Sequence, residues 1–317
     1  MGLIFISNLE TLASRIRKGD KRALSRAITL VENQTNEGTQ LLNILGIPSH
    51  PKSHIIGITG APGAGKSTLV NNLIQAYLSE NKTVGVLAVD PSSPFSGGAV
   101  LGDRIRMLDN TLHPNFFMRS MGSRGHLGGL VATILETLLL FEHFGFDIII
   151  VETVGAGQSE VEIADFCDTT VVVVVPGLGD SIQHLKAGIM EIADIFVVNK
   201  ADLPGAETVK NQIHSTLTLI PSQRKIPPIL LTSSTSGTGI DELVANLQSH
   251  FEHLKTTKTL PEIRKKRIRK AIQNRARLKL DLIIPTLGNE LSEQVYNNSI
   301  TLDEAAKLLL KELKNQL

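Results

Sequence analysis

The sequence predicts an α/β protein with a mostly parallel β-sheet, helices on both faces of the sheet, and a helical extension at each end of the chain. Between residues 54 and 252, seven short apolar runs alternate with stretches of helical spacing, as expected for repeated βα units. The 317 residues are 42% hydrophobic but only 4% aromatic and contain no Trp, so the core is aliphatic and suits a buried parallel sheet. We therefore divide the chain into an N-terminal helical extension (1–50), an α/β domain (51–254) and a C-terminal helical region (255–317).

The N-terminal extension carries two amphipathic helical patterns between residues 8 and 45. Their apolar residues recur at helical spacing: Leu9, Leu12 and Ile16 in the first, and Leu24, Ile28 and Val31 in the second. Asp20 precedes the second pattern and is a plausible N-cap, because its carboxylate can accept hydrogen bonds from the first backbone N–H groups of a helix.

Seven apolar runs are the expected strands of the α/β domain: residues 54–60, 83–90, 116–121, 147–153, 169–177, 194–200 and 227–234. In sheets of this kind a ligand lies at the carboxyl ends of the strands. The polar motifs described next follow these runs directly, so we expect them to meet at one edge of the sheet.

The first strand leads into GAPGAGKS at residues 60–67, which fits the phosphate-binding template G-x-x-x-x-G-K-[ST]. Gly60, Gly63 and Gly65 allow positive φ angles, with which backbone N–H groups can surround phosphate oxygens. Lys66 is expected to reach the β- and γ-phosphates, and the helix beginning near Ser67 directs its positive end at the anion. The remaining residues expected to contact the nucleotide here are Ala61, Pro62, Ala64 and Thr68. The motif predicts a P-loop NTPase fold and nucleoside triphosphate binding.

A triphosphate brings Mg²⁺, which prefers oxygen ligands and uses one or two carboxylates besides phosphates and water. The Ser67 hydroxyl is one predicted ligand. Three carboxylates are candidates for the others: Asp90 and Glu152 end predicted strands, and Asp103 lies in a Gly-rich loop. For each carboxylate, an N-cap or turn role is the alternative.

Three further residues are candidates for sensing or hydrolysing the γ-phosphate. Gly155 can present its N–H to the phosphate, a contact that is lost on hydrolysis and is typical of a switch loop. Gln158 can orient the attacking water. Lys186, in the loop 177–188, can approach the phosphates or instead bind a partner. With Lys66, Gln158 and Lys186 are the expected catalytic residues.

The motif NKAD at residues 199–202 predicts the identity of the base. A carboxylate at Asp202 can accept hydrogen bonds from guanine N1–H and N2, whereas adenine has no matching pair of donors. Asn199 can bond the other edge of the base, and the methylene stem of Lys200 can lie along its face. After the last strand, Ser233, Ser234 and Thr235 are expected to support the base through their N–H groups. Residues 51–254 thus read as a GTPase domain.

The C-terminal region is strongly basic at first: residues 255–279 contain eleven Lys or Arg and one acid, Glu262. We expect a solvated helix face with Ile263, Ile268 and Ile272 turned inward, which is compatible with a dimerisation arm. Nucleic-acid binding is the alternative, but the segment lacks interleaved aromatic residues and a known binding module.

The last segment, 301–313, begins with a capping box between Thr301 and Glu304. Its predicted apolar stripe comprises Leu302, Ala306, Leu309 and Leu313.

The composition argues against several classes of protein. A net charge of +1 gives no general attraction for nucleic acid. A single cysteine, Cys167, excludes a disulfide or a Cys-based zinc cage within the chain and suggests a reducing compartment. No run reaches the ~18 apolar residues of a membrane span. We expect a cytoplasmic protein that binds neither nucleic acid nor membrane.

Five motifs together resemble the methylmalonyl-CoA mutase-associated GTPase family, of the MeaB or ArgK type: GAPGAGKST, VDPSSPFSGGAVLGDRIRM, MRSMGSRGHLGG, VETVGAGQSEVEIAD and GIMEIADIFVVNKADLPGA. The resemblance implies a metallochaperone-like G protein that hydrolyses GTP with Mg²⁺ and guards an adenosylcobalamin-dependent mutase. It implies that Asp90, Asp103 and Glu152 are Mg²⁺ or switch residues and that 177–188 is a switch loop answering to the mutase. It also implies a homodimer held by the C-terminal helices. We expect no tightly held cobalamin on this chain itself.

Two departures from the family pattern are visible: Ser234 stands where Ala is usual, and His184 where Gly is usual. Two other functions compete with the mutase chaperone. A nickel-insertion GTPase belongs to the same broad class but usually has His-rich or Cys metal sites. A kinase or ATPase linked to amino-acid transport would need to tolerate adenine, against which NKAD argues.

Overall fold

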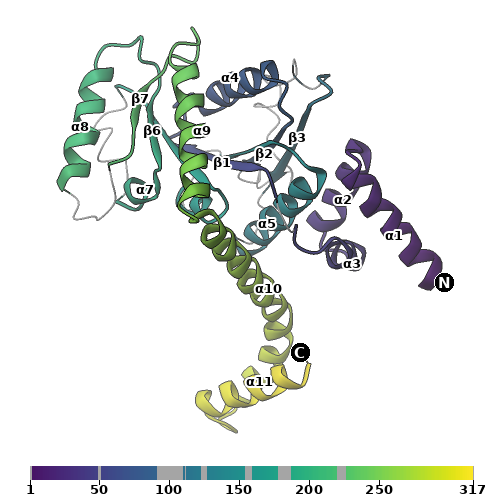
Figure 1. Ribbon diagram of the computed structural model, residues 1–317. Helices are drawn as coiled ribbons and strands as arrows, with labels where there is room; N and C mark the ends of the chain where they lie inside the picture. Colours follow the sequence, from purple (N-terminus) through teal and green to yellow (C-terminus); the bar gives the residue numbers. More distant parts are fainter. Residues whose placement is uncertain are drawn as a thin grey trace.

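The computed structural model describes residues 2–48, 51–90, 110, 112–122, 127–153, 159–177, 187–219 and 226–316. Three helices come first, followed by an alternation of strands and helices and then by two helices at the C-terminal end (Figure 1). The strands are β1 (His54–Gly60), β2 (Val84–Asp90), β3 (Phe116–Gly122), β4 (Ile148–Thr153), β5 (Thr169–Val174), β6 (Ile195–Val198) and β7 (Ile229–Leu231). The α-helices of the domain are α4 (Lys66–Ser79), α5 (Leu127–Phe144), α6 (Ser159–Glu162), α7 (Ala187–Ile192), α8 (Ala206–Leu219) and α9 (Ile240–Thr256).

All seven predicted strands form one sheet in the order β3-β2-β4-β1-β5-β6-β7, and every neighbouring pair is parallel. The predicted fold class is therefore confirmed. β1 lies in the middle, between β4 and β5. Because parallel strands end at the same edge, the loops after β1, β4 and β6 lie on one side of the sheet.

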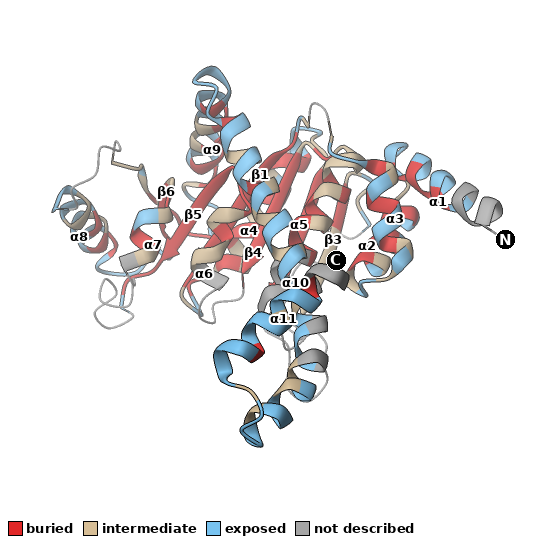
Figure 2. Cartoon of the chain, turned by 90° about the horizontal axis from the view of Figure 1, so that it is seen from below, coloured by how far each residue is buried: buried red, intermediate tan, exposed pale blue. Residues whose placement is uncertain are grey.

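Helices cover both faces of the sheet, and each face has its own buried cluster (Figure 2). Side chains alternate between the faces with the two-residue period of a strand. Ile55 and Ile149 face α5 and the N-terminal helices, whereas Ile56 and Ile150 face α4 and α9. The central strands are therefore apolar on both faces, as a buried parallel sheet requires.

The N-terminal extension has three helices rather than the two expected: α1 (Gly2–Arg17), α2 (Lys21–Glu32) and α3 (Asn36–Leu45). Asp20 is confirmed as the N-cap of α2, since its side chain accepts hydrogen bonds from the N–H groups of Arg22 and Ala23. The missed helix α3 is capped by Thr35. Its first residues are polar and include Gly38, so no apolar repeat marks its beginning.

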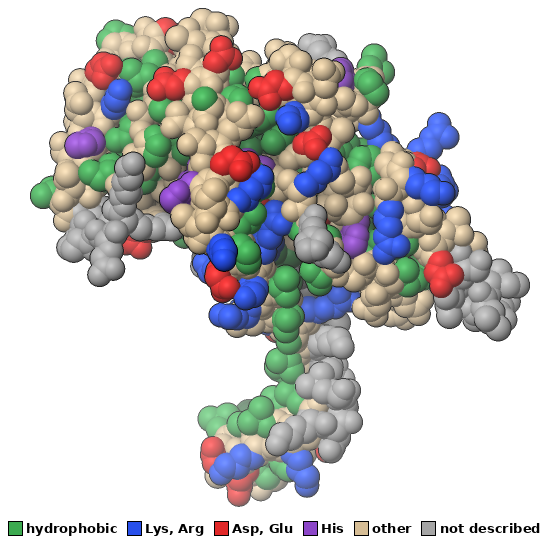
Figure 3. Space-filling model, viewed as in Figure 1, with side chains coloured by type: hydrophobic (Ala, Val, Ile, Leu, Met, Phe, Trp, Pro, Cys, Tyr) green, Lys and Arg blue, Asp and Glu red, His purple; other side chains and the backbone are tan. Residues whose placement is uncertain are grey.

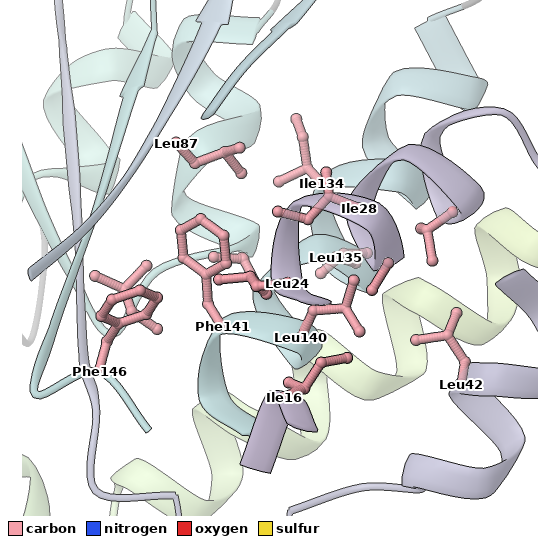
Figure 4. Close-up of a cluster of buried hydrophobic side chains, with 14 of the residues drawn as sticks. Ile16, Leu24, Ile28, Leu42, Leu87, Ile134, Leu135, Leu140, Phe141 and Phe146 are labelled. Carbon is pink, nitrogen blue, oxygen red and sulfur yellow. The ribbon is translucent and has the colours of Figure 1, made fainter. Parts of the chain in front are cut away.

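The N-terminal helices share a core with the sheet. Leu24 and Ile28 of α2 pack in the same cluster as Leu140 and Phe141 of α5 and Leu87 of β2 (Figure 4). Helix α2 is also joined to β3 by an ion pair between Glu32 and Arg119. The extension is thus built onto one face of the sheet.

The C-terminal region consists of α10 (Leu260–Tyr296), which projects away from the sheet, and α11 (Leu302–Gln316), which lies at its far end (Figure 1). The prediction that Ile263, Ile268 and Ile272 of the basic segment turn inward is partly wrong. Ile263 packs on the end of α9, but Ile272 is 65% exposed, while Arg267 is 6% exposed. Arg267 turns inward because it forms ion pairs with two buried carboxylates, Asp168 at 2.5 Å and Glu142 at 3.5 Å.

The capping box at the start of α11 is confirmed, because the Thr301 N–H donates to Glu304 and the Glu304 N–H donates to Thr301 Oγ1. The predicted stripe is wrong at two positions. Leu302 is 78% exposed and Ala306 is exposed, whereas Ala305 and Leu313 are buried. Leu313 and the half-buried Leu309 lie where the stripe places them, so the buried side of α11 includes Ala305 in place of Leu302 and Ala306.

Over the described ranges, every helix is too short or too polar to cross a bilayer.

Candidate nucleotide-binding site

The loop between β1 and α4 has the backbone that the glycine pattern predicted. Gly60, Gly63 and Gly65 have φ angles of 139°, 75° and 83°. Any side chain at Gly60 would place its Cβ 2.1 Å from the carbonyl oxygen of Val173, and a Cβ at Gly65 would lie 2.5 Å from Asn199 Nδ2. These two glycines are required by close approach as well as by conformation.

Lys66 begins α4 and is 6% exposed. Its ammonium donates to the carbonyl oxygens of Gly60, at 2.6 Å, and Ala61, at 3.1 Å, so the side chain folds back over the loop. The positive charge and the N-terminus of α4 are thereby directed at the same place, which is an anion site. Of the other predicted loop residues, Ala64 is buried, Pro62 is exposed, and Thr68 is half-buried in α4.

Two of the four predicted metal ligands lie together. The Ser67 hydroxyl donates to Glu152 Oε1 at 2.7 Å, and Glu152 is 2% exposed. They meet because Glu152, the last residue but one of β4, pairs with Ile58 of the neighbouring strand β1. A hydroxyl and a buried carboxylate at this distance fit Mg²⁺, which prefers hard oxygen ligands. Asp90 ends β2, the other neighbour of β4, but its side chain lies outside the described residues.

Four predicted residues cannot be placed, since Asp103, Gly155, Gln158 and Lys186 lie outside the described residues. Their roles stay predictions. Among the residues that are described, no three His, Cys, Asp or Glu side chains form a metal cluster.

The base-recognition candidates gather at the ends of β6 and β7. Ser233 Oγ donates to Asp202 Oδ1 at 2.6 Å, and this bond lowers the pKa of the Asp202 carboxyl below its usual value, so the group is an ionised acceptor near neutral pH. Lys200 has a φ of 57°, and its ammonium reaches Gly63 O at 2.9 Å. Its methylene stem therefore crosses from NKAD to the phosphate-binding loop.

Asn199 has a role that sequence reasoning missed. It is 1% exposed, its Nδ2 donates to Ala64 O at 2.9 Å, and its Oδ1 accepts from Thr232 Oγ1, Ser234 N and Ser234 Oγ. Asn199 thus joins the loop after β7, residues 232–239 (the base loop), to the phosphate-binding loop, residues 60–67. The hydroxyl residues at the end of the last predicted strand, Thr232 and Ser234, were the signal in the sequence for this network.

Two backbone groups expected to support the base are engaged elsewhere. Ser233 N–H donates to Thr238 O at 3.0 Å, and Ser234 N–H donates to Asn199 Oδ1. This differs from the expectation because the turn after β7 closes on itself through the bridge between Ser233 and Thr238. Contacts of Asn199 and Thr235 with a base stay predictions.

Comparison with known proteins agrees with this site. A family model described as "Methylmalonyl Co-A mutase-associated GTPase MeaB" matches residues 24–284. A putative GTPase of Pyrococcus abyssi is 46% identical over 269 residues, covering 84% of this chain and 83% of the relative. A putative GTPase of Pyrococcus horikoshii is 42% identical over 315 residues, covering 96% and 98%.

The structure is also similar to a crystal structure titled "LAO/AO transport system kinase". The TM-score is 0.71 at 26% identity, with 97% of this chain and 98% of that chain covered. The family model covers residues 24–284, which include both the phosphate-binding loop and the NKAD loop. The chain belongs to the methylmalonyl-CoA mutase-associated GTPase (MeaB) family.

Proposed function

We propose that this protein binds GTP with Mg²⁺, hydrolyses it to GDP and phosphate, and couples the change to loading or protection of an adenosylcobalamin-dependent acyl-CoA mutase. The observation that carries the nucleotide assignment is the ionised Asp202 carboxylate, which Ser233 orients in the loop after β6. Asn199 and Lys200 of the same loop bond to the phosphate-binding loop. The mutase assignment is supported by the name of the family model.

In the proposed reaction, Lys66 neutralises charge on the β- and γ-phosphates, and the loop N–H groups hold their oxygens. Ser67 and Glu152 would hold the Mg²⁺ ion, which would neutralise phosphate charge when bound. Water attacks the γ-phosphorus, the bond to the β-phosphate oxygen breaks, and GDP and phosphate leave. Gln158, Gly155 and Lys186 remain the candidates for positioning water and sensing the γ-phosphate.

Asp202→Asn tests the base assignment. An amide cannot accept from both guanine donors, but it can donate to the 2-oxo group of xanthine. We expect GTP affinity to fall by about 100-fold and xanthosine triphosphate to become the preferred ligand, because a mismatched polar pair costs several kcal/mol. Competition against a fluorescent GDP analogue measures both. Unchanged GTP affinity, or efficient ATP hydrolysis by the unaltered protein, would show that Asp202 does not read guanine.

The mutase assignment has its own test. A pull-down from the native cell, with the protein loaded with a GTP analogue, should recover a cobalamin-dependent mutase, and recovery of no such enzyme counts against the chaperone role. Stoichiometric tight binding of nickel would instead favour metal insertion.

We also propose that the protein is a homodimer held by α10 and α11. The support is a set of apolar side chains on this arm that are more than a third exposed (Figure 3): Ile272, Ile284, Tyr296, Leu302, Leu308 and Leu310. A hollow of about 500 Å³ between the two helices is lined mainly by apolar residues, including Leu291 and Val295. Exposed apolar area of this kind marks an interaction surface.

By light scattering, we expect the unaltered protein to have twice the chain mass of 34.3 kDa. The double variant Tyr296→Glu, Leu302→Glu should instead have the mass of one chain. Two buried charges would oppose association by several kcal/mol. Glu290→Lys, a charge change at an exposed position of α10, is the control and should remain a dimer. A dimer in the double variant would locate the interface elsewhere.

A further inference from the structure

Asn72 connects the helix after the phosphate-binding loop to the loop expected to bind the base. It lies on α4 and is half-buried, and its Nδ2 donates to the carbonyl oxygen of Ser234 at 2.7 Å. Asn72 lies five residues after Ser67 along α4 and is not among the residues proposed to hold the phosphates or the metal ion. Its bond instead determines where the backbone of the base loop stands relative to α4.

Ser234 continues this connection toward Asn199. Its hydroxyl donates to Asn199 Oδ1 at 2.8 Å and its N–H donates to the same oxygen at 3.2 Å. The amide of Asn199 in turn donates to Ala64 O, and it packs so closely on the loop that any Cβ at Gly65 would collide with it. The hydrogen bonds therefore form a closed path from α4 through Ser234 and Asn199 to the phosphate-binding loop.

A nucleotide that bridges two subsites binds best when the distance between them is already correct, since otherwise binding must order the loop at a cost in free energy. We propose that Asn72 and Ser234 are positioning residues for guanine-nucleotide binding, which hold the base loop at the spacing that one nucleotide spans. The proposal rests on the proposed GTP-binding function. It adds Asn72 to that site and gives Ser234, expected above to support the base through its N–H, a positioning role through Asn199. Neither residue belongs to the set proposed to hold the phosphates, the metal ion or the attacking water.

The discriminating comparison uses GDP, inosine diphosphate and Mg²⁺-tripolyphosphate. Inosine diphosphate lacks the exocyclic amine that Asp202 is expected to read, and tripolyphosphate has no base. A displaced base loop weakens GDP binding and lowers the preference for GDP over inosine diphosphate, but leaves tripolyphosphate binding unchanged. General damage to the fold weakens all three ligands by a similar factor.

In Asn72→Ala, we expect GDP and GTP to bind about three- to tenfold more weakly, as for loss of one hydrogen bond. The preference for GDP over inosine diphosphate should fall, and tripolyphosphate affinity should not change. Asn72→Asp keeps the size of the side chain but replaces the donor by a charge that repels the carbonyl, so its effect should be at least as large. Ser234→Ala should weaken GDP about two- to fivefold, because its N–H bond to Asn199 remains.

Asn71→Ala is the matched control. Asn71 is the preceding residue of α4 and is also half-buried, but its side chain accepts a hydrogen bond from Asn110 and makes no bond to the base loop. We expect this variant to bind all three ligands like the unaltered protein. Calorimetric titration gives the affinities, and thermal unfolding of the nucleotide-free proteins compares stability.

Unchanged GDP affinity and an unchanged preference over inosine diphosphate in both Asn72 variants would overturn the proposal. An equal loss for all three ligands would overturn it too, because Asn72 would then act only on the fold. These outcomes differ from failure of the proposed function: if the unaltered protein binds ATP as well as GTP, the base assignment itself is wrong.

Discussion

Lys66→Ala should abolish measurable GTP and GDP binding. In the structure, the Lys66 ammonium is already held over the loop by two carbonyl oxygens, at the N-terminus of α4. Removing it takes away the charged donor that would bind both terminal phosphates. Charge-assisted hydrogen bonds contribute about 1.5–3 kcal/mol each, so two of them correspond to a loss of affinity of roughly 100-fold or more. Calorimetric titration with each nucleotide measures the loss.

Lys307, an exposed lysine on α11, provides a control for this experiment. Lys307 is 72% exposed on α11, where it pairs with Asp303, and Lys307→Ala should bind nucleotide normally. Unaltered GTP affinity in Lys66→Ala, with normal thermal unfolding, would rule out residues 60–67 as the phosphate site.

Asp168→Asn should lower the free energy of unfolding by about 3–5 kcal/mol, the usual effect of breaking a buried ion pair. The Asp168 side chain is fully buried immediately before β5, accepts from Arg267 at 2.5 Å, and also accepts from the Ile55 N–H at 3.0 Å. The variant leaves Arg267 buried beside Glu142, whose pKa is raised by burial. One neutralised carboxyl therefore weakens the attachment of α10 to two central strands.

Urea unfolding measures this effect, and an exposed pair on the same helix supplies the comparison. Lys265 and Glu262 are 66% and 69% exposed, so Lys265→Ala should change stability by less than about 1 kcal/mol. Equal, small losses in both variants would mean that the α10 junction contributes little to stability.

Most of the sheet was predictable because strands of a buried parallel sheet are short, continuous and apolar. Helix α3 was not predicted, because its first residues are polar and show no apolar repeat, although the helix packs against α2. A Cβ at Gly38 would lie 2.6 Å from Leu30 O, so α2 and α3 approach more closely there than any side chain allows. Such an approach has no periodic signature in the sequence.

The inward face of α10 could not be chosen from the sequence for a related reason. An apolar pattern predicts burial of isoleucine, and it favoured Ile272 over Arg267. Burial of Arg267 depends on Asp168 and Glu142, which lie far away along the chain and come together only when β5 and α5 are folded.

The sequence by itself predicted the candidate residues at each strand end: three glycines and a lysine for phosphate, Ser67 and Glu152 for a metal, and Asp202 for guanine. It could do so because these are local motifs, in which neighbouring residues act together. The tertiary structure decided how the motifs are connected. Asn72, Ser234 and Asn199 join the base loop to the phosphate loop, and Arg267 joins α10 to the sheet. These connections depend on the packing of distant segments, which residue spacing along one chain does not encode.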